Sequence, residues 1–191
     1  MHKPLEDLKH DHRLIERVLA VLEEAGRRLE RGEEVSPDLL DQALTFVRGF
    51  ADGCHHAKEE RGLFPTLAQK GPMLEAGPVR IMLMEHELGR SLIADLADAT
   101  EQMREGKAEG RRAARAAIEG YAGLLRDHIA KEEDVLFLMA QNLLGADDVE
   151  GLSEQFEQVE REAGADAHER FAALVREMEA AVGLTAPTHH P

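Results

Sequence analysis

The sequence is poor in the residues on which β-sheet and disulfide-rich proteins rely. Its 191 residues include no tryptophan, one tyrosine and one cysteine, and aromatic residues make up only 4%. A lone cysteine, Cys54, excludes an internal disulfide and gives no reason to expect an oxidising compartment. Few aromatic residues disfavour sheets, whereas abundant alanine, leucine, glutamate and arginine favour long helices. The chain is therefore predicted to be nearly all α-helical.

Net positive charge and long apolar runs are also missing. The formal charge is −15, and the acidic residues are spread along the whole chain. Such a charge argues against nucleic acid as a partner. No stretch approaches the roughly 18 apolar residues of a membrane span, and the first ten residues lack the apolar core of a signal peptide. We therefore expect no nucleic-acid partner, no membrane association and a cytoplasmic location.

Helical periodicity divides the chain into four long segments and a weaker C-terminal region. The long segments span about residues 5–31, 37–65, 79–105 and 109–144. Ser36 followed by Pro37 predicts the start of the second helix. The short connections predict an antiparallel up-down-up-down four-helix bundle over residues 1–147. Residues 148–182 are predicted to form one or two appended helices, broken near Gly164, and residues 183–191 a flexible tail.

One ten-residue motif occurs twice. HHAKEERGLF at residues 55–64 recurs as HIAKEEDVLF at residues 128–137, with seven identical positions. In each copy a histidine is followed four residues later by a glutamate. On a helix this spacing places His55 beside Glu59, and His128 beside Glu132, on one face. Two helices that present such pairs to each other predict a two-metal site inside a bundle.

Each copy is preceded by one further histidine. His12 lies 43 residues before His55, and His86 lies 42 residues before His128. The first two predicted helices thus look like a duplicate of the third and fourth, related by a pseudo-two-fold axis. The candidate metal ligands are His12, His55, Glu59, His86, His128 and Glu132.

The chemistry of these six donors restricts the metal. Four imidazoles and two carboxylates suit iron, manganese or zinc better than calcium or magnesium, which prefer oxygen ligands. The absence of cysteine from the set excludes an iron–sulfur cluster. If both glutamates bridge two metals, each metal has two histidines and two carboxylate oxygens. Coordination positions then remain for a bridging oxygen and an exogenous molecule.

The first copy of the motif leaves one choice of register open. His56 and Glu60 are four residues apart, as are His55 and Glu59. Ile129 takes the place of His56 in the second copy, which favours His55 and Glu59. Glu60 and Glu133 are then expected on the outer face or close behind the ligands.

With these residues, the chain resembles the hemerythrin-like (HHE cation-binding) domain family. The pattern H…HxxxE…H…HxxxE carries the resemblance, which covers residues 5–144. It implies an antiparallel four-helix bundle that holds two iron ions, oxo- or hydroxo-bridged, on the six residues named above, with both glutamates bridging. It also implies dioxygen, nitric oxide or peroxide as the molecule that meets the iron pair.

The chain departs from the oxygen-carrying members of that family. They have five histidines, with an HxxxH pair on the third helix, whereas no second histidine follows His86 here. We therefore do not expect a reversible oxygen carrier, and the sequence leaves open whether the protein is an enzyme. The leading hypothesis is a diiron protein that binds, senses or detoxifies a small oxidant or gas. The alternative is an iron-handling or metal-sensing helical module whose docking to a partner depends on metal loading.

Three further residues carry expectations. Ile15 lies three residues after His12, but Gly89 lies three residues after His86, so we expect an accessible coordination position on the His86 side. Cys54 is expected to be a buried filler rather than a redox thiol. His168 is expected to make contacts in the appended region rather than bind metal.

Overall fold

The computed structural model describes residues 1–184, and in that range the secondary structure is helical throughout. The longer helices are α1 (Lys3–Glu30), α2 (Pro37–Phe46), α5 (Arg80–Arg104), α6 (Ala108–Lys131), α8 (Ala146–Ala163) and α9 (Ala167–Val182). The shorter ones are α3 (Phe64–Ala68), α4 (Pro72–Leu74) and α7 (Phe137–Leu143). Four segments are π-helical: η1 (Val47–His56), η2 (Glu59–Leu63), η3 (Glu75–Val79) and η4 (Glu132–Leu136). The all-α prediction is confirmed.

Several helix ends form where the local sequence predicts them. The side chain of Ser36 accepts a hydrogen bond from the backbone N–H of Asp38 at 3.2 Å, and Pro37 is the first residue of α2. Gly164, at φ +106°, separates α8 from α9 in a conformation that favours glycine, so the appended region contains two helices. The predicted tail at 183–191 lies outside the described residues from 185 onward.

Among the helices of residues 1–184, we find none with the length and apolar character needed to cross a membrane.

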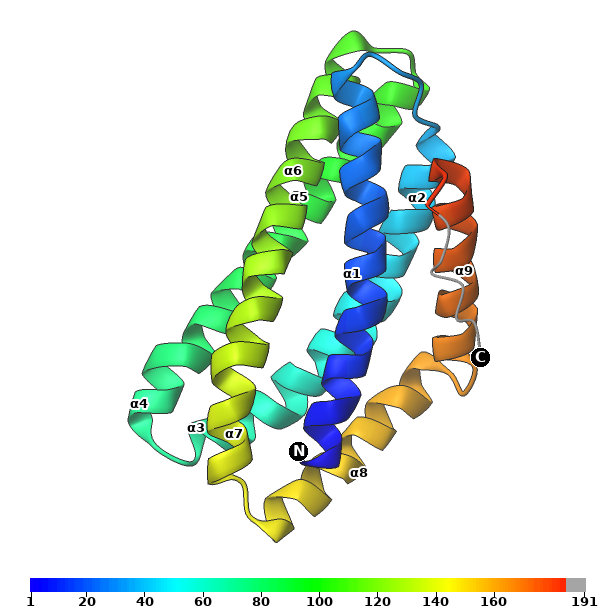
Figure 1. Ribbon diagram of the computed structural model, residues 1–191. Coiled ribbons are helices and arrows are strands. Elements are labelled where there is room, and N and C mark those ends of the chain that lie inside the picture. Colours follow the sequence, from blue (N-terminus) through cyan, green and yellow to red (C-terminus); the bar gives the residue numbers. More distant parts are fainter. Residues whose placement is uncertain (185–191) are drawn as a thin grey trace.

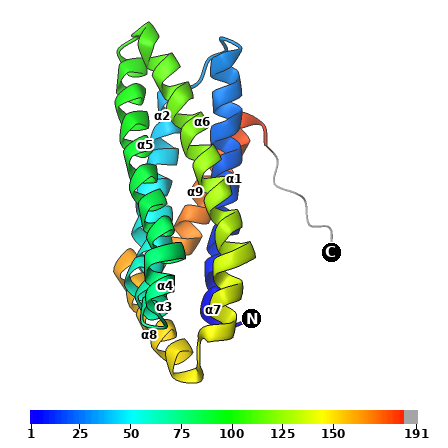
Figure 2. The ribbon, with the colours of Figure 1, turned by 90° about the vertical axis from the view of Figure 1, so that its left-hand side faces the viewer.

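The long helices lie lengthwise beside one another, and the C-terminal pair covers one side of them. Figure 1 shows α1, α2, α5 and α6 running along the molecule, with α5 and α6 packed against each other. After α7 the chain turns into α8, which crosses η1, η2 and α1, and α9 then packs along α1 and α2. Figure 2 shows the same layout from the side of α5 and α6, with the N-terminus close to α7. The C-terminal helices therefore contact the first half of the chain.

Two apolar clusters fill the interior, one on each side of a polar layer. The larger cluster includes Ile15, Phe50, Ile93 and Leu125, and the smaller one includes Leu8, Leu63, Met82 and Leu136. Along each main helix, the chain passes from one cluster to the other through a histidine or glutamate. This layer is where the predicted ligands lie, enclosed by apolar packing above and below.

Candidate metal centre

Each main helical segment contributes side chains to the polar layer. His12 comes from α1, His86 from α5 and His128 from α6. The motif residues lie at π-helical segments: η1 ends with His55 and His56, η2 begins with Glu59, and η4 begins with Glu132. Such widened turns often occur at functional sites in helices. All seven side chains are buried.

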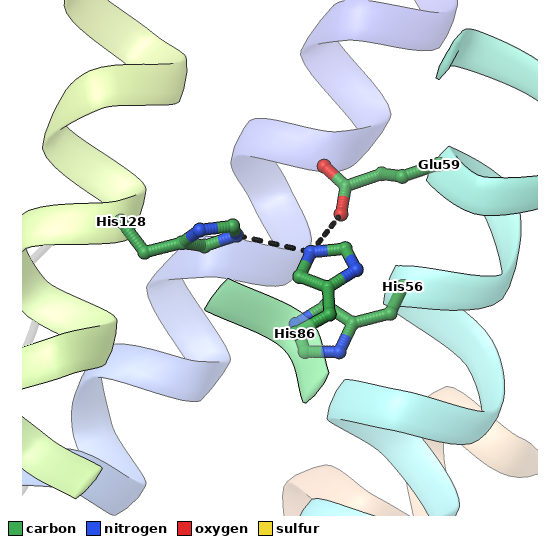
Figure 3. A group of neighbouring side chains, drawn as sticks. All are labelled: His56, Glu59, His86 and His128. Carbon is green, nitrogen blue, oxygen red and sulfur yellow. Dashed lines mark hydrogen bonds and ion pairs between the residues drawn. The ribbon is translucent and has the colours of Figure 1, made fainter. Parts of the chain in front are cut away.

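One group of four donors lies on the His86 side. His56, Glu59, His86 and His128 each offer one atom, and these atoms all lie within 4.8 Å of one another. Figure 3 shows the side chains converging from three directions, with His86 close to both His128 and Glu59. The two Nε2 atoms of His86 and His128 are 3.1 Å apart, and His86 Nε2 lies 3.5 Å from Glu59 Oε2.

A second group lies on the His12 side and shares Glu59 with the first. It consists of His12, His55, Glu59 and Glu132, again with donor atoms within 4.8 Å of one another. His12 Nε2 lies 3.1 Å from both His55 Nε2 and Glu132 Oε2.

Both glutamates face histidines of the two groups. Glu132 Oε1 lies 3.4 Å from His128 Nε2, while its other oxygen faces His12. Glu59 Oε2 lies 3.6 Å from His55 Nε2, in addition to its approach to His86. Each carboxylate therefore lies between two sets of imidazoles, the position that a bridging ligand requires.

Several atoms of this layer lack hydrogen-bond partners within residues 1–184. Both carboxylate oxygens of Glu59, Oε1 of Glu132 and Nε2 of His56 are buried and unpaired. A buried polar atom without a partner destabilises the fold. A cation among the donor atoms of each group would provide partners for all four of these atoms. The donor set and its unpaired atoms thus fit a pair of metal ions.

The two carboxylates differ in how they titrate without a cation. Burial and the neighbouring Glu132 carboxylate raise the pKa of Glu59 well above its usual range. Burial alone would raise the pKa of Glu132 too, but His128 and His12 outweigh it and lower that pKa. Of the two carboxylates, Glu59 is therefore the one that holds a proton more readily in the metal-free chain.

A ring of carboxylates holds the outer nitrogens of the histidines. Glu133 Oε1 lies 2.9 Å from His12 Nδ1, and Glu60 Oε1 lies 2.7 Å from His86 Nδ1. In each copy of the motif, the first glutamate faces the polar layer and the second orients a histidine from the other half of the chain. Such partners fix the ring orientation and tautomer of a metal-binding imidazole. The repeated Glu-Glu pair is thereby explained.

The residues before the upstream histidines belong to the same ring. Glu85, which precedes His86, lies 2.9 Å from His128 Nδ1 and also pairs with Lys131. Asp11, which precedes His12, occupies the matching place in the first half. Asp11, Glu85 and the lysines beside them are not among the residues predicted from the sequence, although Asp or Glu before the histidine, and Lys within the motif, occur in both halves.

His56 is the main difference from the predicted site. The repeat favours His55 over His56 as the ligand. The structure instead places His55 in the group with His12 and His56 in the group with His86. Consecutive helical side chains point about 100° apart, and the site lies between these two directions. Asp52 Oδ1 lies 3.3 Å from His56 Nδ1, and burial lowers the pKa of His56 to about 3, so its imidazole is neutral. The repeat does not predict His56 as a ligand, because the matching position of the second copy is Ile129.

A pocket adjoins the group on the His86 side. Its volume is about 240 Å³, and its lining includes His56, His86, Gly89, Arg90 and Tyr121. Ile15, the counterpart of Gly89, is instead buried in the larger apolar cluster. Since Gly89 adds no side chain to the wall, space remains next to His86, on the side where the sequence predicted access.

Comparison with known proteins gives a family match over most of the chain. The model of the hemerythrin HHE cation binding domain matches residues 3–140, which includes every residue of both groups. One uncharacterized protein from Mycobacterium bovis and two from Mycobacterium tuberculosis are each 24% identical over 180 residues, covering 94% of this chain and 70% of theirs. No solved structure matches the chain.

Proposed function

The chain belongs to the hemerythrin HHE cation binding domain family, and on that premise we propose that it holds two iron ions. One ion is held by His56, Glu59, His86 and His128, and the other by His12, His55, Glu59 and Glu132. Glu132, which also lies 3.4 Å from His128 Nε2, is proposed to bridge the ions together with Glu59. The observation that carries this assignment is the convergence of buried, unpaired donor atoms in two groups that share Glu59. The proposed set contains the six residues expected from the sequence, with His56 added.

The proposed architecture is the antiparallel up-down-up-down four-helix bundle. Residues 1–147 form this bundle, and residues 148–182 form a helical appendage packed on it. The two halves of the bundle are related by the duplicated motif. Support comes from the cross-half pairs, in which Glu133 holds His12 and Glu60 holds His86.

We infer that the iron pair binds, senses or detoxifies a small oxidant or gas, with dioxygen, nitric oxide and peroxide as the candidates. Iron supplies the redox chemistry when bound. The protein supplies imidazoles whose outer nitrogens are held by carboxylates, and two apolar clusters that keep bulk water away.

The exogenous molecule is proposed to enter on the His86 side. A small molecule is proposed to reach the donors of the first group through the pocket beside Gly89. The matching place in the other half is filled by Ile15, which is 2% exposed. Access is therefore expected at one group only.

Metal analysis with optical spectroscopy tests the proposal. Purified protein should contain about two irons per chain and show the absorption of a coupled ferric pair, which changes on addition of azide or nitric oxide. His55→Ala should lose that absorption, whereas His10→Ala, a histidine outside both groups, should retain it. Zinc alone in the purified protein would contradict the redox function. Metal-dependent stability with no gas-dependent optical change would favour the metal-sensing module instead.

A further inference from the structure

Within the described residues, α8 and α9 contact the ring of carboxylates around the polar layer on the side of the first half of the chain. Lys58 and Lys131 occupy the same position of the duplicated motif, but the Lys58 side chain is 0% exposed and that of Lys131 is 45% exposed. The difference arises from α8. Glu160 lies 2.7 Å from Lys58 Nζ, and the ring centroid of Phe156 lies 5.8 Å from the same atom.

The buried lysine leads directly to the ring of carboxylates. Lys58 Nζ donates to Asp11 Oδ2 at 3.1 Å, and the same oxygen lies 3.5 Å from His55 Nδ1. The second C-terminal helix reaches Asp11 as well, because His168 Nε2 lies 3.3 Å from Asp11 Oδ1. Two residues of the appendage thus reach the proposed metal ligand His55 through few intermediates: His168 through Asp11, and Glu160 through Lys58 and Asp11.

Asp11 lies between Lys58, His168 and His55, and its contact with His55 is the longest of the three. A distance of 3.5 Å is too long for a sound hydrogen bond, and within the described chain His55 Nδ1 has no partner. In the other half, Glu85 lies 2.9 Å from His128 Nδ1, with no residue of α8 or α9 involved. The contact between Asp11 and His55 is therefore the one that α8 and α9 can change.

We propose that docking of α8 and α9 sets how firmly Asp11 holds His55, so that these helices and metal at the His12–His55 group stabilise each other. An imidazole that binds a cation through Nε2 donates from Nδ1, and a carboxylate partner there strengthens the metal bond. Because Glu160 pairs with Lys58 from its other side, Asp11 is free to turn from Lys58 toward His55 when metal binds. The inference rests on the proposed metal site and assigns it a regulatory element within the chain.

Coupling of this kind is reciprocal. If docked helices tighten metal binding by some factor, bound metal must stabilise the docking by the same factor. The proposal therefore predicts two separate observables: faster metal loss when the link is weakened, and slower hydrogen exchange in α8 and α9 when metal is present.

Two glutamates of α8 provide a matched pair of variants. Glu160 pairs with buried Lys58, whereas Glu162 pairs with exposed Arg61 at 2.6 Å and makes no contact that leads to Asp11. Glu160→Gln and Glu162→Gln each remove one charge from the same helix and weaken one ion pair to the same neighbouring segment. Only the first variant should affect His55.

The 191-residue chain is loaded with Fe²⁺ in the absence of oxygen. Transfer of the metal to a chelator is then followed, together with hydrogen exchange of residues 146–182. In the unmodified protein, metal should slow exchange in these helices. Glu160→Gln should release one of the two ions about 10-fold faster, the lower end of the effect of losing an outer partner of a histidine ligand, and should lose the metal-dependent protection. Glu162→Gln should behave like the unmodified protein.

Each other outcome has a definite meaning. Equal release rates and equal exchange in both variants would overturn the inference while leaving the metal site intact. A chain that takes up no metal would overturn the proposed function and this inference with it. If Glu160→Gln loses α8 altogether, His168→Ala replaces it, since His168 is partly exposed and its loss removes the α9 contact to Asp11. Unchanged metal release in that variant would also refute the coupling.

Discussion

His56 stacks on His86, with ring centroids 3.8 Å apart and an angle of 15° between the planes. The contact joins the end of η1 to α5 and places a fifth imidazole beside the donors of the His86 group. Oxygen-carrying relatives, as the resemblance implies, obtain their fifth histidine from the third helix. In this chain the extra imidazole comes from the neighbouring segment, and it lines the pocket through which we propose that small molecules enter.

Replacing His56 by the residue at the matching position of the other half tests its role. His56→Ile should keep the fold, because Ile129 is buried in the second copy of the motif. It should weaken binding of one of the two metals by at least about 10-fold, a loss no smaller than that from removing an outer partner of a ligand. Competition with a chelator measures the affinity. His10→Gln is the control, and two equally tight sites in His56→Ile would exclude His56 as a ligand.

The sequence predicts the parts of this site that depend on local geometry. A spacing of four residues places His55 with Glu59 and His128 with Glu132 in any helix, and the repeat supplies the two upstream histidines. The helix start at Ser36 and the break at Gly164 likewise follow from local chemistry. These features need no knowledge of how the helices pack.

Other features depend on contacts between distant segments, which periodicity does not specify. The pairing of Glu133 with His12 crosses 121 positions of sequence. The burial of Lys58 requires α8 to lie over it, although the same residue type at Lys131 remains exposed. Comparison of the two motif copies favours His55 over His56 only if the two halves bind metal in the same way. The candidate site includes His56, at a position where the second copy has Ile129.

Gly89 controls the space beside His86 in the proposed function. A Cβ atom at this position would lie 3.7 Å from side-chain atoms of Leu125 and Tyr121, which is ordinary contact. Gly89→Ala should therefore fold and bind azide or nitric oxide nearly as the unmodified protein does. Gly89→Leu should fill part of the pocket and slow binding by about 10-fold or more, as measured by stopped-flow absorbance of the iron-loaded protein. Unchanged rates in the leucine variant would move the entry route elsewhere.

Cys54 is expected to be chemically inert in the folded protein. It is 0% exposed, and burial raises the pKa of its thiol to about 11. Because the thiolate is the reactive form, reaction with an aromatic disulfide reagent at pH 8 should be at least about 100-fold slower in the folded chain than in urea. Cys54→Ala provides the blank. Rapid reaction without denaturant would show that the thiol is accessible and would reopen a redox role.

Removal of metal should make the stability of the chain strongly dependent on pH. Burial lowers the pKa of His55 to about 4 and that of His56 to about 3, and burial likewise lowers the pKa of His128. In the unfolded chain these histidines take up protons near pH 6.5. As the pH falls from about 6.5 to 4.5, the unfolded state therefore takes up protons at His55 and His56 that the folded state does not, and the lowered pKa of His128 acts in the same direction. Glu59 acts in the opposite direction, because a carboxyl with a raised pKa holds its proton more readily in the folded state.

His55 and His56 fix the sign of the prediction for the metal-free protein, because the unfolded state binds up to two more protons at these residues than the folded state does. Its free energy of unfolding should fall as the pH is lowered from about 6.5 to 4.5, by up to about 2.7 kcal/mol per pH unit. Urea denaturation at a series of pH values, with a chelator present, measures this slope. His56→Ile should reduce it by about one proton, since the variant removes one titrating histidine from the unfolded chain. A free energy of unfolding that stays constant over this range, in both the unmodified protein and His56→Ile, would contradict the prediction, because it would mean that the folded state binds as many protons as the unfolded state and that folding does not hold His56 neutral.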